Sequence, residues 1–237
     1  MTLRLNPGVL VAIEGIDGAG KTTQAGLVAE RLRAAGLEVV RTKEPTDGPW
    51  GQRLRASAAT GRLSSEEELR AFVEDRREHV ANLIRPALAA GQVVIVDRYY
   101  FSTAAYQGAR GMDPEELLRL NEAFAPEPDL LVLLEVAPAV GVGRIREREG
   151  QGGNLFEREE DLGRSAAIFA RLVKPYLVRL DGTRSREELT AEILTALRQG
   201  PLWCRLCAAL KKEGSADCPP GGCVLAADGC EFSLLKV

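Results

Sequence analysis

The chain has 237 residues, of which 45% are hydrophobic and 27% charged, with a formal net charge of -3. This length can bury one complete α/β core and leave a short remainder. The sequence has no long basic stripe for a nucleic-acid backbone, and no run of about 18 uncharged apolar residues for a membrane helix. We therefore expect a cytoplasmic protein that binds small molecules, with no nucleic acid and no membrane among its partners.

Apolar runs separated by helical segments organise most of the chain. The runs that predict buried strands are 9–14, 37–42, 92–96, 129–136 and 176–181. Helices are predicted over 21–35, from 64 onward, from 114 onward, and over 138–148, 159–174 and 185–197. Strands that alternate with helices form parallel sheets. We therefore expect an α/β fold with a doubly wound, five-stranded parallel sheet.

Local signals mark where several of these helices begin or change. Asp113 is placed to cap a helix whose first residue is Pro114. Ser185 and Glu188 have the spacing of a capping box. Pro86 interrupts the long helical pattern that begins at residue 64, which predicts a kink or break there.

A glycine-rich loop follows the first predicted strand and matches G-x-x-x-x-G-K-[ST] at every fixed position. Glycines let successive backbone amides turn toward phosphate oxygens, and the following helix adds its positive end. Lys21 would reach the β and γ phosphates of ATP, and the Thr22 hydroxyl would hold Mg²⁺. The predicted nucleotide-binding residues are Gly15, Ile16, Asp17, Gly18, Ala19, Gly20, Lys21 and Thr22.

The P-loop predicts binding of a nucleoside triphosphate and leaves the reaction open. The chain lacks the Asn-Lys-x-Asp motif with which GTPases read guanine. The third strand is followed by Asp97, a candidate Mg²⁺ ligand, and then at once by Arg98. An arginine at this place suits an enzyme that neutralises two phosphate groups brought together. The pattern favours a kinase.

Four segments together resemble the thymidylate kinase family of P-loop nucleoside monophosphate kinases: 15–24, 72–76, 97–99 and 102–108. The resemblance extends over about residues 8–198. It implies a P-loop NTPase fold, ATP-dependent phosphorylation of dTMP to dTDP with Mg²⁺, and a homodimer. Two alternatives stay open: another P-loop nucleoside monophosphate or deoxynucleoside kinase, or a weakly catalytic nucleotide-binding regulator.

The resemblance also implies roles for individual residues. Asp17 would bind the sugar 3′-hydroxyl, Phe72 would stack on thymine, and Arg76 would hold the acceptor phosphate. Arg98 would bridge the donor and acceptor phosphates, while Asp97 would help to place Mg²⁺. The pocket for thymine and deoxyribose would be lined by Ser102, Thr103, Tyr106 and Gln107.

Several residues in this region also fit structural roles. Phe72 and Tyr106 suit core positions, and Arg76 suits a solvated helix face. Glu44, before Pro45, is either part of an acidic turn near the acceptor or a solvated loop residue. We assign His79, the only histidine, a structural role in its helix.

Arginines flank the glycine-rich segment 150–153 and predict a mobile lid over about residues 144–160 that closes on ATP. The alternative is an exposed amphipathic helix whose arginines pair with neighbouring glutamates. Gly18 stands where some relatives carry an arginine, which favours an arginine supplied by the lid.

Asn154 and Leu155 stand where many bacterial relatives have Asp-Arg, so the identity of the lid arginine stays open between Arg148 and Arg158. The predicted catalytic residues are therefore Lys21, Arg98, Asp17, Arg148 and Arg158.

All five cysteines lie after residue 200, in a segment that differs in composition from the rest. The predicted division is a P-loop domain at 1–199 and a cysteine-rich C-terminal extension at 200–237. A tetrahedral structural zinc site is one prediction for the extension. Its ligands would be Cys204, Cys207, Cys218 and Cys223, with Cys230 spare. The alternatives are oxidisable or disulfide-forming cysteines, or an extension without a defined cysteine role.

Overall fold

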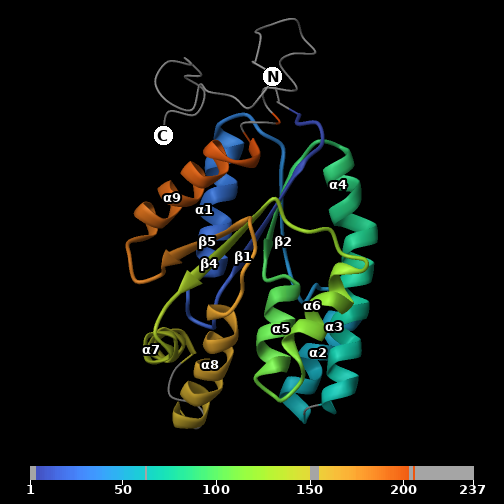
Figure 1. Cartoon of the computed structure of the whole chain (residues 1–237), viewed down its shortest axis with the longest axis vertical. Coiled ribbons are helices and arrows are strands. Elements are labelled where there is room, and N and C mark those ends of the chain that lie inside the picture. The colour runs from blue at the N-terminus through green and yellow to red at the C-terminus, as the bar shows by residue number, and fades with distance from the viewer. Residues whose placement is uncertain (1–3, 62, 150–154, 203–204, 206–237) are drawn as a thin grey trace, which may run out of the picture.

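The structure is a computed structural model that describes residues 4–61, 63–149, 155–202 and 205. A parallel sheet with the strand order β2-β3-β1-β4-β5 runs through its centre (Figure 1). The strands are β1 (Val9–Glu14), β2 (Val39–Lys43), β3 (Val93–Asp97), β4 (Leu130–Glu135) and β5 (Leu177–Asp181). The predicted α/β class with a doubly wound, five-stranded parallel sheet is confirmed.

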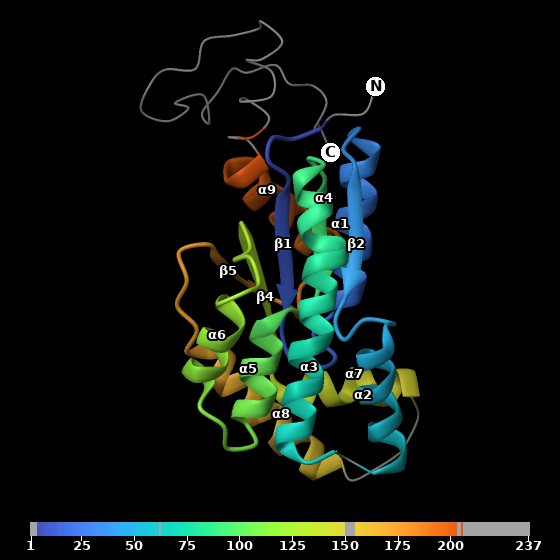
Figure 2. The same ribbon diagram turned by 90° about the vertical axis from the view of Figure 1, so that its right-hand side faces the viewer.

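Helices cover both faces of the sheet (Figures 1 and 2). The described helices before β4 are α1 (Lys21–Ala34), α2 (Pro49–Thr60), α3 (Ser65–His79), η1 (Val80–Ile84), α4 (Arg85–Ala89), α5 (Tyr100–Gly108) and α6 (Pro114–Glu122). After β4 they are α7 (Pro138–Glu149), α8 (Leu155–Ala170) and α9 (Arg186–Gln199). Helices α1 and α9 pack together on one face, and η1 and α4 run along the other.

Each central strand contributes to two hydrophobic cores because successive side chains point to opposite faces. In β1, Val9, Val11 and Ile13 pack with residues of α1 and α9. Leu10 and Ala12 pack on the opposite face, with residues of η1 and α5. Burial on both faces is the reason why these strands read as continuous apolar runs.

The predicted caps are confirmed. The Asp113 carboxylate accepts hydrogen bonds from the backbone amides of Glu115 and Glu116 at the start of α6. Ser185 and Glu188 form the capping box that begins α9.

Pro86 does not end the long helix. Instead, α3 passes into the π-helix η1 and continues as α4, with Pro86 in the first turn of α4. The Arg85 amide donates to the Val80 carbonyl, five residues back. The wider turn lets the chain pass a residue that has no amide hydrogen to donate. Of the predicted kink or break, a break does not occur, and the hydrogen-bond pattern changes just before Pro86.

Two helices that the sequence patterns do not predict lie beside the carboxyl ends of the strands. Helix α2 begins with Pro49 and lacks a strong apolar stripe. Helix α5 has nine residues and begins without a local capping side chain. Its first amides are capped by a side chain from another element, which is described below.

The packed structure continues past residue 199. Leu202 is fully buried in the core formed with α1 and α9. Arg205 donates to the carbonyl of Gly8 and pairs with Asp129, at the amino ends of β1 and β4. Among the described helices, none is long and apolar enough to cross a membrane.

Candidate active site

The candidate site lies at the carboxyl edge of the sheet, where β1 and β3 end side by side. Ile13 pairs with Asp97 in the sheet register, so the P-loop after β1 and the Asp97–Arg98 turn after β3 are neighbours. This edge is the usual ligand-binding edge of an open parallel sheet. Most of the predicted site residues line two of the cavities that open there.

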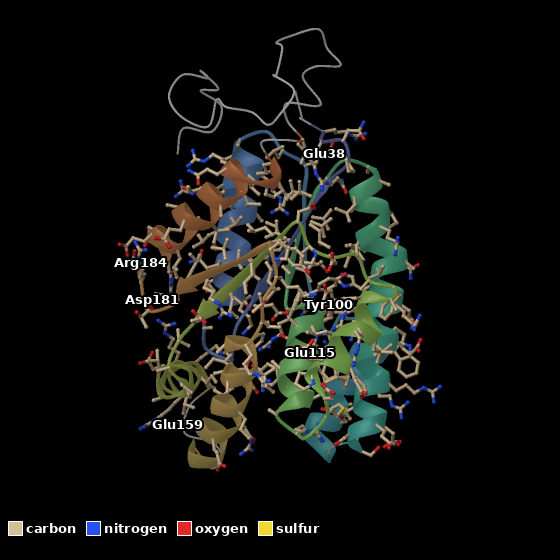
Figure 3. The ribbon with its side chains drawn as sticks, in the orientation of Figure 1. Glu38, Tyr100, Glu115, Glu159, Asp181 and Arg184 are labelled. Carbon is tan, nitrogen blue, oxygen red and sulfur yellow. The ribbon has the colours of Figure 1, made fainter. Side chains whose placement is uncertain are left out.

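The larger cavity, of about 770 Å³, surrounds the P-loop. The loop ends at Gly20, whose φ of 101° gives way to the first turn of α1. Lys21 is 5% exposed, and its Nζ donates to the carbonyl of Ile16 at 2.8 Å. Burial, reinforced by repulsion from Arg98, lowers the pKa of Lys21 to about 7. The loop therefore holds a poorly solvated amine that an anion would stabilise. Figure 3 labels Arg184, which lines this cavity beyond the end of β5.

Helix α7 lies directly against the P-loop. Gly18 has a φ of 81°, and a side chain there would collide with the backbone of Gly141. Arg144 then ties α7 to the loop, because its guanidinium donates to the carbonyls of Gly18 at 3.2 Å and Gly182 at 3.0 Å. This contact gives a steric reason for the glycine at position 18. Arg144 was expected only as an arginine of the predicted lid, and not as a residue that contacts the P-loop.

Of the two candidate lid arginines, the structure describes the side chain of Arg148 alone. Arg148 is exposed near the end of α7 and lines the larger cavity. Arg158 lies in α8, and its side chain is outside the described part of the structure.

The smaller cavity, of about 180 Å³, is lined by all the residues predicted to bind the acceptor. Half-buried Phe72 of α3 and Tyr106 of α5 contribute aromatic rings to its wall. Its lining comprises Asp17, Glu44, Pro45, Phe72, Arg76, Arg98, Tyr99, Ser102, Thr103, Tyr106 and Gln107. The structure thus brings all the predicted substrate-binding residues together.

Asp17 and Arg98 line both cavities. The Arg98 guanidinium pairs with the Asp17 carboxylate, donates to the Ser102 hydroxyl at 3.3 Å, and lies 5.2 Å from the centre of the Tyr106 ring. Arg98 has a φ of 68°, a backbone conformation that is uncommon for a residue with a side chain. An ion pair therefore stands where the two cavities meet.

Glu14, at the end of β1, anchors this arrangement and was not predicted as a site residue. Its carboxylate is fully buried and accepts from the amides of Tyr99 at 2.7 Å and Ser102 at 3.1 Å. It also accepts from the Ser102 hydroxyl at 2.6 Å. These bonds cap the start of α5 from another element and fix the turn that carries Arg98. Burial raises the pKa of Glu14.

Arg76 is 1% exposed and closes the inner side of the smaller cavity. It donates to Glu44 through Nε at 2.7 Å, and to Thr103 at 3.0 Å. It also donates to Asn121 of α6, which is itself fully buried. The solvated-face interpretation of Arg76 is therefore wrong. Asn121 carried no sequence signal, because its partner lies 45 residues away.

Comparisons with known proteins agree with this geometry. The family model described as thymidylate kinase matches residues 13–193. The chain belongs to the thymidylate kinase family. A thymidylate kinase of Xanthomonas oryzae pv. oryzae (strain PXO99A) is 57% identical over 176 residues, which cover 74% of this chain and 77% of the relative. A thymidylate kinase of Xylella fastidiosa (strain M12) is 54% identical over 187 residues, which cover 79% and 85% of the two chains.

Kinases of this family use Mg²⁺ with ATP, and oxygen ligands suited to Mg²⁺ are present beside the P-loop. The Thr22 hydroxyl donates to one oxygen of Asp97. The other oxygen, Oδ1, is buried and has no hydrogen-bond partner among the described residues. A buried carboxylate oxygen without a donor is suited to a cation. Thr22 and Asp97, the predicted metal residues, therefore fit Mg²⁺.

The zinc prediction concerns cysteines that all lie outside the described residues. Within the described part of the chain, no cluster of three or more potential metal-binding His, Cys, Asp or Glu residues occurs.

Proposed function

We propose that this protein transfers the γ-phosphoryl group of ATP to dTMP and forms ADP and dTDP. The observation that carries the proposal is the pair of cavities that meet at Asp17 and Arg98. A kinase for a monophosphate needs a donor site and an acceptor site in contact, with positive charge between them. Membership of the thymidylate kinase family identifies the acceptor as dTMP.

On the donor side, the P-loop amides and Lys21 would bind the phosphates of ATP. Thr22 and Asp97 would hold Mg²⁺, which neutralises charge on the phosphate oxygens when it is bound. We also propose that Arg148, which lines the donor cavity, is the lid arginine whose positive charge stabilises the phosphoryl group during transfer. Arg158 stays the second candidate for this role. The lid over about residues 144–160 stays a prediction.

On the acceptor side, Phe72 would stack on thymine, and Asp17 would bind the 3′-hydroxyl. Arg98 would bridge the acceptor phosphate and the transferring group, which its place between the cavities supports. The role of Arg76 as a phosphate ligand stays a prediction. Because Arg76 already donates to Glu44, Thr103 and Asn121, a phosphate would have to compete with those partners.

Ser102, Thr103, Tyr106 and Gln107 would complete the pocket for the nucleoside. Thr103 and Gln107 are buried, and Gln107 donates to Glu68 of α3 at 3.1 Å. Together with the bond from Arg76 to Thr103, this bond holds α5 against α3, so the pocket has its shape before the acceptor binds. We propose that binding therefore requires little rearrangement of α5.

A coupled assay of ADP release across dTMP, dUMP, dCMP, dGMP and AMP tests the proposal. We expect the highest kcat/KM with dTMP. Equal rates with several monophosphates would contradict specificity for dTMP and indicate a nucleoside monophosphate kinase of broad specificity. Turnover at the background level together with intact ATP binding would favour the alternative of a weakly catalytic nucleotide-binding regulator.

Three further proposals rest on the sequence and the family. We propose a homodimer, which analytical ultracentrifugation would test, and a cytoplasmic location. Structural zinc in the extension is the third. A metal assay on the purified full-length chain that finds zinc near zero would contradict it.

A further inference from the structure

A series of hydrogen-bonded polar side chains runs from half-buried Thr42 of β2 to buried residues of α3, behind the acceptor cavity. His79 of α3 is 5% exposed and does not line that cavity. Its Nδ1 lies 2.9 Å from Oε1 of Glu44, and its Nε2 lies 2.8 Å from the hydroxyl of Thr42. Both ring nitrogens are therefore engaged, on opposite sides of the imidazole.

The partner of each nitrogen fixes the direction of its hydrogen bond. A carboxylate oxygen only accepts, so Nδ1 carries a hydrogen and donates to Glu44. In the neutral ring, Nε2 then accepts from the Thr42 hydroxyl. The imidazole thus offers Glu44 a donor whose orientation is held from behind by Thr42.

Glu44 divides its two oxygens between His79 and Arg76. Oε1 faces His79, whereas Oε2 accepts from Nε of Arg76 and lies 2.7 Å from its terminal nitrogen. Glu44 and Arg76 both line the acceptor cavity. Without His79, Oε1 would be buried without its donor, and the carboxylate could turn away from the orientation that Arg76 requires.

The segment around Glu44 has a second, independent attachment to α3. The Asp75 carboxylate accepts from the Thr46 amide at 2.8 Å and from the Thr46 hydroxyl at 2.6 Å. This attachment does not involve His79. Loss of the imidazole should therefore change the orientation of Glu44 without releasing the whole segment.

We propose that His79 is a positioning residue for the acceptor: its hydrogen bond to Glu44 sets the Glu44–Arg76 pair that lines the acceptor cavity. The inference rests on the proposed function, because it assigns that cavity to dTMP. It differs from a general structural role, since it predicts an effect confined to the acceptor.

Two amide substitutions separate the contacts of His79. In His79→Asn the amide nitrogen takes the place of Nδ1 and keeps the donor to Glu44. In His79→Gln the amide reaches the place of Nε2 and keeps the contact with Thr42. We expect His79→Gln to raise the KM for dTMP about tenfold, the effect of losing one hydrogen bond to a charged group. The KM for ATP should stay within about twofold, and His79→Asn should behave nearly as the wild type.

Thr42→Val is the matched control, because it removes only the Nε2 contact, and its KM for dTMP should stay within about twofold. A double-mutant cycle of His79→Gln with Glu44→Gln tests whether His79 acts through Glu44. The double variant should be no worse than Glu44→Gln alone.

Several outcomes would overturn the inference. These are additive effects in the cycle, equal increases in both KM values, identical behaviour of the Asn and Gln variants, or a His79→Gln chain that does not fold by circular dichroism. The same assays distinguish it from the proposed function. If the wild type does not phosphorylate dTMP, the proposed function fails. If the wild type does so and the variants do not separate, only this inference fails.

Discussion

The phosphate cradle of the donor half is one continuous loop, to which other elements add charged side chains, whereas the acceptor half is assembled entirely from side chains of several elements. The donor cavity is the larger of the two and surrounds the P-loop, where the Nζ of Lys21 donates to the carbonyl of Ile16. The acceptor cavity is smaller, and two of the side chains that line it, Arg76 and Glu44, form a buried ion pair. A cradle of backbone amides depends on a contiguous motif, while a buried network depends on the tertiary fold.

The two halves should therefore respond differently to substitution. A buried positive charge that is stabilised only by a bound anion lowers the stability of the ligand-free protein, because no partner offsets the cost of its burial. A charge in a satisfied buried network supports the fold, because removing one partner leaves the other uncompensated.

The largest expected effect is at Arg98, which lies between the two halves. Arg98→Ala should lower kcat about a thousandfold, since it removes the charge shared by the two phosphates. Steady-state kinetics with ATP and dTMP measure the effect. Arg70→Ala, which removes an exposed arginine of α3, is the control and should have little effect. A loss of less than tenfold at Arg98 would contradict the bridging role.

Lys21→Met and Arg76→Met should change stability in opposite directions. In buffer free of nucleotide and metal at pH 7, Lys21→Met should raise the free energy of unfolding by about 1 kcal/mol while lowering kcat about a hundredfold. Arg76→Met should lower the free energy of unfolding by about 3 kcal/mol, because it leaves the buried Glu44 carboxylate without its cationic partner. Urea unfolding measures both changes.

The gain from Lys21→Met should also depend on pH. Burial first, and then Arg98, lowers the pKa of Lys21 to about 7, so the ammonium is penalised in the folded state below that pH. The penalty is relieved as the pH rises from about 7 toward the ordinary lysine value. The advantage of the variant should thus be largest near pH 6 and shrink in alkaline buffer. An advantage that grows with pH would contradict this explanation.

Glu14→Gln should have a moderate effect that is confined to turnover. The amide keeps the volume of the carboxylate but presents a donor to the Ser102 hydroxyl, which loosens the turn that carries Arg98. We expect kcat to fall about tenfold and each KM to change less. Glu30→Gln, at an exposed position of α1, serves as the control. An unchanged kcat would contradict the role of Glu14 in positioning Arg98.

Truncation should have the smallest effect on activity. A chain that ends at Arg205 should keep kcat within about twofold, since the nucleotide site lies at the other edge of the sheet. A chain that ends at Gln199 should melt about 5–10 °C lower, because it loses the fully buried Leu202 and the Arg205 contacts. Differential scanning calorimetry compares the two. Equal melting temperatures would support the predicted division at residue 199.

The sequence sufficed for features whose signals are local. The strand at Val9–Glu14, the P-loop after it and the capping box at Ser185 each involve residues close together in the chain. These features were predicted within a few residues. The predicted substrate-binding residues also came together, because their motifs follow strands or lie on helices at one edge of the sheet.

Features that depend on distant partners were not predictable in this way. Glu14 caps a helix that begins more than 80 residues later, and Arg144 bonds to Gly18 across 126 positions. Helix α5 was not predicted because it is short and its first amides are capped by Glu14 from a distant strand, with no capping residue close in the sequence. An acidic residue at the end of a fully buried strand was the signal that could have indicated Glu14. For Asn121 we find no such signal.

Arg205 is bonded beside Gly8, at the amino end of β1, whereas the P-loop leaves from the carboxyl end of the same strand. Six residues of extended chain separate the two ends by about 20 Å. The C-terminal side of the domain is therefore a natural attachment point for engineering. A protein immobilised or labelled through a linker placed after Arg205 would present its nucleotide edge away from the support.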